Sequence, residues 1–185
     1  MNQLIWVNQL DQLTEAVISN FGLLRHEDLY FKPDANRWSI AENLAHLIVV
    51  NRTYFPVIEQ IRNNTYKVPF IGKIPFLPKL FGSVLIEYVK PEKEEAKVKT
   101  FPIWEPANFK EEGSILELFE KHQQALRNLR IENEDLIQRK QIIASPANNN
   151  IVYSLDDAFD VILLHEQRHF IQSKAVLALL DKNVI

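Results

Sequence analysis

Two sequence segments carry the residue pattern that fixes the first turn of an α-helix, and each opens a long amphipathic stretch. Ser39-Ile40-Ala41-Glu42 and Ser114-Ile115-Leu116-Glu117 are capping boxes, in which a serine hydroxyl and a glutamate carboxylate bond reciprocally to backbone amides. Apolar residues then recur every three or four positions, as they do on the buried face of a helix. Two further stretches share this period. The sequence predicts an all-α chain with helices near residues 2–24, 39–63, 114–135 and 154–181.

These helices predict an up-and-down four-helix bundle that forms a single domain over residues 1–185. Pro56 lies inside the second helical stretch and cannot donate a backbone hydrogen bond, so a kink or break is expected between Arg52 and Phe55. The last helix is expected to begin near Ser154, with acidic residues in its first turn, where the helix dipole favours them.

Residues 64–113 differ in composition from the rest of the chain. They hold six of the nine prolines and three of the four glycines, which predicts a long crossover insertion between helices two and three, outside the bundle. Its apolar side chains are expected to bury against the bundle or against a second subunit; they are Phe76, Leu77, Leu80 and Phe81. The charged run from Lys90 to Lys99 is interpreted as a solvated loop.

Composition removes several classes of function. The chain has no cysteine, so any metal must be held by His, Asp or Glu, and disulfides and protein thiolates are excluded. A net charge of −3 argues against nucleic-acid binding. Uninterrupted apolar runs reach only four residues, whereas a membrane span needs roughly 20. With no secretory signal visible at the N-terminus, the expectation is a soluble, cytoplasmic protein without a membrane partner.

The histidines are the candidate metal ligands. His165 and His169 are four residues apart on the last helix, so both imidazoles lie on one face and can reach one ion. Gln172 continues that face, and His46 lies among apolar residues on the second helix, from which it can supply a third nitrogen. Glu42, one turn before His46, is either an acceptor for an imidazole N–H or simply part of the capping box. Hydrogen-bonded core histidines and a solvent-facing polar stripe remain the alternatives.

The same histidine pair forms a literal HExxH match, the helix motif of zinc proteases, with Glu166 as the general base. The surroundings argue against a protease. Metzincins have glycine and histidine at the positions that Gln172 and Ala175 occupy here, and no glutamate follows His169 to act as a downstream ligand.

Two motifs together resemble the DinB-like (DinB/YfiT) superfamily of four-helix-bundle proteins. RWSIAENLAHL at residues 37–47 is similar to the WSxxExxxHL entry to helix two, and HEQRHFIQ at residues 165–172 is similar to HxxxHxxQ on the last helix. The resemblance implies a divalent metal, zinc or nickel, bound by His46, His165 and His169. It also implies a thiol S-transferase acting with a low-molecular-weight thiol such as bacillithiol, mycothiol or glutathione, and it is compatible with a homodimer.

The leading hypothesis is therefore a metal-dependent enzyme for a small-molecule substrate, with an external thiol because the chain has none. Two rival hypotheses stay open: a metal-dependent hydrolase that uses a metal-bound water with Glu166 or Glu42 as base, and a non-catalytic helical binding module. Trp6 and Trp38 are interpreted as core or cap-packing aromatics, and Trp104 is assigned to neither core nor site. The remaining histidines, His26 and His122, are interpreted as surface or loop residues.

Overall fold

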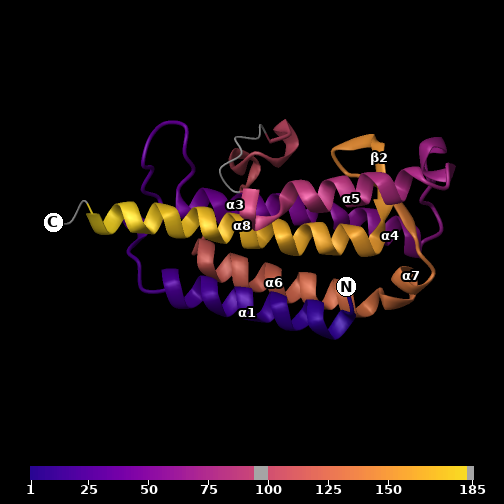
Figure 1. Cartoon of the computed structure of the whole chain (residues 1–185). Coiled ribbons are helices and arrows are strands. Elements are labelled where there is room, and N and C mark those ends of the chain that lie inside the picture. Colours follow the sequence, from indigo (N-terminus) through magenta and orange to yellow (C-terminus); the bar gives the residue numbers. More distant parts are fainter. Residues whose placement is uncertain (94–99, 183–185) are drawn as a thin grey trace.

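The computed structural model describes residues 1–93 and 100–182, which are mostly helical with a small two-stranded sheet (Figure 1). Short 3-10 turns lie at Phe70–Lys73, Pro91–Lys93, Pro102–Trp104 and Pro106–Asn108. The helices and strands are α1 (Gln3–Phe21), α2 (His26–Leu29), α3 (Ile40–Arg52), α4 (Tyr54–Arg62), α5 (Leu77–Val89), α6 (Ile115–Glu132), α7 (Glu134–Gln138), β1 (Ile142–Ser145), β2 (Asn148–Ser154) and α8 (Leu155–Lys182).

The start of α3 and the break after it follow the sequence prediction. Ser39 Oγ accepts from the Glu42 amide at 3.1 Å, and the Glu42 carboxylate accepts from the Ser39 amide at 2.8 Å, so the capping box is complete. The helix ends at Arg52 and α4 begins at Tyr54, with Thr53 between them. Pro56 has no amide to donate to the Arg52 carbonyl, which explains a break at this place.

The second predicted capping box does not form. Ser114 is the N-cap of α6, but its side chain makes no capping hydrogen bond. The last helix instead has a box of its own: the Asp157 amide donates to Ser154 Oγ at 3.0 Å, and the Asp157 carboxylate accepts from the Ser154 amide at 3.3 Å. The start of α8 near Ser154, with acidic residues in its first turn, is confirmed.

Strands β1 and β2 form an antiparallel hairpin that the sequence analysis did not predict. Ile143 pairs with Tyr153 and Ala144 with Val152, and these four side chains are buried. The Tyr153 hydroxyl lies 2.9 Å from the Tyr54 hydroxyl of α4, which connects the hairpin to the helical core. The hairpin occupies the connection between α7 and α8 (Figure 1).

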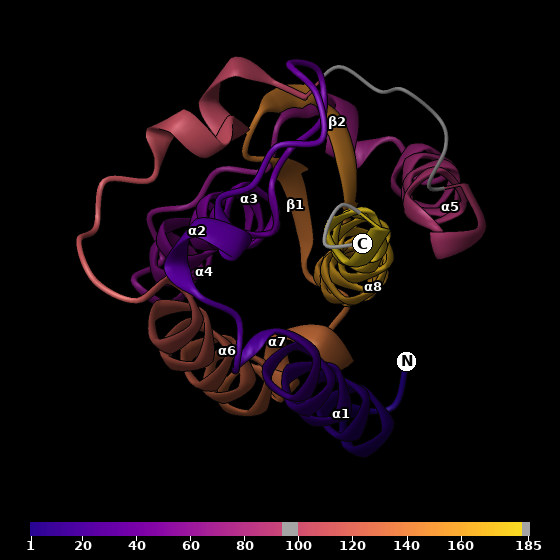
Figure 2. The same ribbon diagram turned by 90° about the vertical axis from the view of Figure 1, so that its left-hand side faces the viewer.

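The long helices enclose two apolar clusters. Both α1 and α3 pack on α6 and on α8, and Figure 2 shows these helices end-on around a common interior. One cluster includes Trp6 and Phe159, and the other includes Phe21 and Phe119. Gln123 of α6 and Glu166 of α8 are buried between the two clusters along their helices. A buried polar layer therefore crosses the middle of an otherwise apolar core.

Residues 64–113 pack closely against the helices where the structure describes them. Helix α5 packs along α8 and on β2, and the 3-10 turns at 102–108 pack on α3 (Figures 1 and 2). Gly82 permits the α5 contact, because a Cβ at this position would lie 2.4 Å from the Asp157 carboxylate. Much of the insertion is thus built onto the helices that carry the candidate site.

The apolar side chains at the start of α5 divide into two groups. Leu77 and Phe81 are half-buried, whereas Phe76 is 65% exposed and Leu80 is 51% exposed, so the prediction of burial against the bundle is wrong for the latter pair. Their burial against a second subunit stays a prediction. The charged run at 90–99 falls largely on residues 94–99, outside the described residues. Among the helices described, none combines the length and apolarity needed to cross a bilayer.

Candidate metal centre

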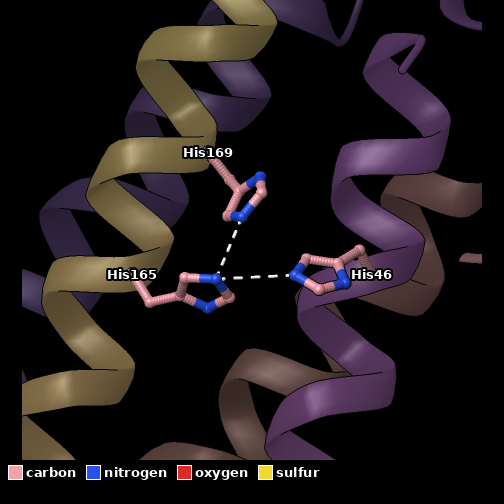
Figure 3. A group of neighbouring side chains, drawn as sticks. All are labelled: His46, His165 and His169. Carbon is pink, nitrogen blue, oxygen red and sulfur yellow. Dashed lines mark hydrogen bonds between the residues drawn. The ribbon is translucent and has the colours of Figure 1, made fainter. Parts of the chain in front are cut away.

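Helices α3 and α8 bring three histidines from distant parts of the chain to one point. The capping box fixes where α3 begins, and His46 follows in its second turn. His165 and His169 are one turn apart on the face of α8 that packs on α3. Figure 3 shows the three imidazole rings facing one another across the gap between the two helices.

The spacing of the three Nε2 atoms suits a single metal ion. His165 Nε2 lies 3.4 Å from His46 Nε2 and 3.0 Å from His169 Nε2 (Figure 3). One ligand atom from each histidine lies within 4.8 Å of the others. Two nitrogens bound tetrahedrally about 2.0–2.1 Å from one zinc ion stand about 3.3 Å apart. The residues present therefore fit a three-nitrogen site with little movement of the rings.

The Nδ1 atoms of two of these histidines face hydrogen-bond acceptors. His46 Nδ1 lies 2.6 Å from the main-chain carbonyl of Trp104, and His169 Nδ1 lies 2.7 Å from Asn43 Oδ1. The Asn43 amide is itself fixed, because its Nδ2 donates to the Ser39 carbonyl at 2.9 Å. A carbonyl can only accept, so both imidazoles carry their proton on Nδ1 and turn an Nε2 lone pair toward the centre.

With these tautomers, the centre of the cluster has fewer hydrogen-bond donors than acceptors. His165 Nε2 has two Nε2 lone pairs as neighbours and can donate a proton to only one of them. At least one buried nitrogen then lacks a donor, which costs about 1–3 kcal/mol in a protein interior. A divalent cation would satisfy all three nitrogens, and the Nδ1 acceptors are the groups that typically orient metal-binding histidines.

Burial keeps the three imidazoles neutral. His46 is 2% exposed and His169 is 7% exposed, and desolvation lowers the pKa of His46 to about 4. Desolvation, reinforced by the neighbouring imidazoles and by Arg168, holds the pKa values of His165 and His169 well below 6.5. A metal ligand must be an unprotonated imidazole, and this environment supplies that form at neutral pH.

Trp38 lies at the histidine cluster, although its sequence position was interpreted as core or cap packing. Its half-buried ring is 4.7 Å from the His46 ring and stacks on the His169 ring at 5.9 Å, centroid to centroid. Trp6, by contrast, is the predicted core aromatic: it is fully buried and its Nε1 donates to the Phe159 carbonyl. Trp38 therefore contacts two of the three imidazoles through its ring.

The two carboxylates considered as catalytic bases are both engaged elsewhere. Glu42 accepts from the Ser39 amide within the capping box and from Lys32 Nζ at 3.0 Å. Glu166 is fully buried and accepts from Asn51 Nδ2 at 2.6 Å and from Gln123 Nε2 at 2.7 Å. Desolvation raises the pKa of Glu166 to about 7. Neither carboxylate hydrogen-bonds to a histidine of the cluster in these contacts.

The other two histidines stay apart from the cluster. His26 is exposed on α2 and its ring packs on Tyr30, as expected of a surface histidine. The interpretation of His122 as a surface or loop residue is wrong, because it is 3% exposed on α6 and its Nε2 has no hydrogen-bond partner. Desolvation lowers the pKa of His122 to about 3.

Sequence reasoning missed two groups that orient the histidines. Asn43 is polar on the buried side of α3, three residues before His46, and that position was the available signal. The Trp104 carbonyl had no signal, because every residue has such a group and 58 positions separate the two partners.

The fold is mostly helical, and two packed helices bring three histidines together. These features place the protein in the class of helical proteins with a candidate metal centre. A family model described as the DinB superfamily matches residues 9–173. The match covers most of the chain, and the protein therefore belongs to the DinB superfamily. Comparisons with curated proteins and with solved structures return no match.

Proposed function

We propose that this protein binds one divalent metal ion through His46, His165 and His169. The observation that carries the proposal is the convergence of three Nε2 atoms whose spacing suits one ion, with the Nδ1 atoms of His46 and His169 held by acceptors. Imidazole suits zinc and nickel, and three protein ligands leave at least one position for a substrate. The framework of this site is an up-and-down four-helix bundle within a single domain, with residues 64–113 inserted between helices two and three.

We further propose that the protein is a thiol S-transferase. The metal would supply Lewis acidity that lowers the pKa of a cosubstrate thiol. The thiol comes from outside, because the chain has no cysteine. A low-molecular-weight thiol such as bacillithiol, mycothiol or glutathione is the cosubstrate class, and a small electrophile is the second substrate. The chain's own part is to hold the three ligands in place and to keep the imidazoles unprotonated by burial.

The positions of the two carboxylates favour a thiol over water as the nucleophile. A thiol whose pKa is lowered by the metal would give its proton to solvent at neutral pH, so this route would need no protein base. Hydrolysis by the rival route assigns that base to Glu42 or Glu166, and both carboxylates are held by other partners. The same contacts argue against the zinc-protease role of Glu166.

Elemental analysis of protein purified without a His tag or chelator tests the metal proposal. The expected result is about one zinc or nickel ion per chain, whereas metal-free protein would favour the non-catalytic binding module. A turnover screen then pairs thiols with electrophiles, and a parallel set of esters and amides without thiol tests hydrolysis. Thiol-dependent turnover supports the transferase. Turnover without thiol would replace it with the hydrolase.

A further inference from the structure

The segment at residues 101–111, called the strap here, is the part of the insertion that packs on α3, the helix that carries His46. Two 3-10 turns shape it, and its Asn108 side chain donates to the Pro102 carbonyl at 2.7 Å. The Phe101 and Trp104 rings meet edge to face at 5.3 Å between centroids. The strap therefore has an internal structure of its own, and it runs alongside α3 (Figure 2).

The strap is anchored to the end of α3. Trp104 Nε1 donates to Thr53 Oγ1 at 3.3 Å, and Glu111 forms an ion pair with Arg52. The Arg52 guanidinium also lies 5.9 Å from the centre of the Phe109 ring. These contacts span both turns of the strap, so its position depends on several groups and not on the histidine alone.

The ligand His46 and the anchor residue Thr53, which is the C-cap of α3, lie on the same side of this helix. Thr53 follows His46 by seven residues, which is about two helical turns, so both side chains lie on the side of α3 that faces the strap. Trp104 contacts both: its indole N–H bonds to Thr53 while its main-chain carbonyl bonds to His46 Nδ1. Thr53 Oγ1 in turn donates to the Val50 carbonyl at 2.6 Å, which fixes the hydroxyl.

We infer that the strap is a positioning segment for His46, and that metal binding and the ordering of the strap stabilise each other. The Trp104 carbonyl holds the His46 proton on Nδ1 and sets the direction of the Nε2 lone pair. A ring whose Nε2 binds a cation becomes a stronger donor through Nδ1–H, so the coupling is reciprocal. This inference rests on the proposed metal site and extends it to a segment of the insertion.

The Nδ1 atoms of His46 and His169 therefore have acceptors from different parts of the chain. His169 takes its acceptor from Asn43, a side chain of α3 itself, whereas His46 takes its acceptor from the insertion. A change in the insertion that leaves α3 and α8 intact should consequently alter metal affinity through His46. The acceptor is a main-chain atom and cannot be removed by substitution. The test must therefore shift the strap by removing its anchor, the hydrogen bond from Trp104 Nε1 to Thr53 Oγ1.

The anchor is removed by Thr53→Val or by Trp104→Phe, and zinc binding is titrated calorimetrically on chelator-stripped protein. We expect each variant to lower zinc affinity on the order of tenfold, as loss of a group that orients a ligand histidine typically does. Thr53→Ser keeps the hydroxyl and should restore wild-type affinity. Glu105→Gln, an exposed substitution on the strap, should leave affinity unchanged. The Thr53→Val/Trp104→Phe double variant should be no weaker than either single variant, because both remove the same bond.

Hydrogen exchange provides a second readout that does not depend on the Thr53 and Trp104 variants. Zinc should slow amide exchange across residues 101–111, and in metal-free protein His46→Ala should speed exchange there while His165→Ala should not. Wild-type zinc affinity in both anchor variants, or exchange in 101–111 that zinc does not change, would overturn the inference while the metal site stands. An unsubstituted protein that binds no zinc would overturn the metal site and the inference together.

Discussion

Hydrogen bonds at Nδ1 decide which tautomer His46 and His169 take. Asn43 Oδ1 and the Trp104 carbonyl hold the protons of His169 and His46 on Nδ1. Their Nε2 lone pairs face His165 Nε2, which can donate a proton to only one of them. At the scale of single residues, the candidate centre is therefore defined as much by the orienting acceptors as by the three imidazoles.

Replacing Asn43 tests the role of the acceptor that faces His169 Nδ1. Asn43→Leu removes the acceptor for His169 Nδ1 at similar side-chain volume, and zinc affinity should fall about 10- to 100-fold. Asn43→Asp keeps an acceptor oxygen and should keep most of the affinity. Calorimetric titration of both variants with zinc makes the comparison. Equal affinities for Leu and Asp would show that the hydrogen bond does not contribute.

His122 makes a prediction about stability that is independent of the metal. Its pKa is about 3 in the folded protein and near 6.5 in the unfolded chain, so the unfolded chain binds the proton first as pH falls. Stability is thus lost as pH drops from 6.5 toward 3. Relative to His122→Leu, the wild type should lose about 2.5 kcal/mol of unfolding free energy between pH 7 and pH 4.5.

Urea unfolding at several pH values measures this difference, with His26→Leu as the exposed control. The control should follow the wild-type profile. Parallel profiles for wild type and His122→Leu would mean that His122 is not held neutral by burial, contrary to its position in the fold.

Individual residues also show what sequence alone can and cannot predict about the site. His165 and His169 were predictable because helical spacing places them on one face, and His46 because the family motif marks it. The burial of His122 had a signal, because it follows Phe119 by three residues and precedes Leu126 by four, although the polar residues beside it indicate a surface stretch. Which side of α6 faces the core depends on how α1 and α3 pack against it.

At the scale of helices and strands, local signals predicted boundaries well and long-range packing poorly. The capping box at Ser39 and the break before Pro56 depend on neighbours within a few residues, and both are present. The hairpin at 142–154 was missed because its strands are short and its second strand opens with three asparagines, which are typical of loops. Packing of the apolar segment at 76–81 against the bundle was expected, but its place on α8 was not, because that depends on Gly82 facing a distant helix.

Gly82 tests that docking. A Cβ at this position would lie 2.4 Å from Asp157 Oδ2 and 2.8 Å from its Cγ, so Gly82→Val should push α5 away from the capped start of α8. We expect a loss of about 1–3 kcal/mol of unfolding free energy, measured by urea unfolding. Ser83→Ala, at the next and exposed position of the same helix, should be neutral or slightly stabilising. A neutral Gly82→Val would mean that α5 does not pack closely on α8.

At the scale of the whole molecule, the candidate centre joins three parts of the chain. Helix α3 supplies His46 and Asn43, α8 supplies His165 and His169, and the insertion supplies the Trp104 carbonyl. Membership of the DinB superfamily rests on residues 9–173, which include all of them. Because metal would bind the folded arrangement and not the unfolded chain, zinc should raise the unfolding free energy by about 2.7 kcal/mol at 100 times its Kd.

Calorimetric titration of chelator-stripped protein with zinc and with nickel tests the central claim most directly. The wild type and His26→Ala should bind one ion per chain, and the His165→Ala/His169→Ala double variant should bind neither metal while keeping its helical circular dichroism spectrum. Equally poor binding by wild type and double variant would show that the three histidines form a buried polar cluster, and the proposed metal-dependent activity would lose its basis.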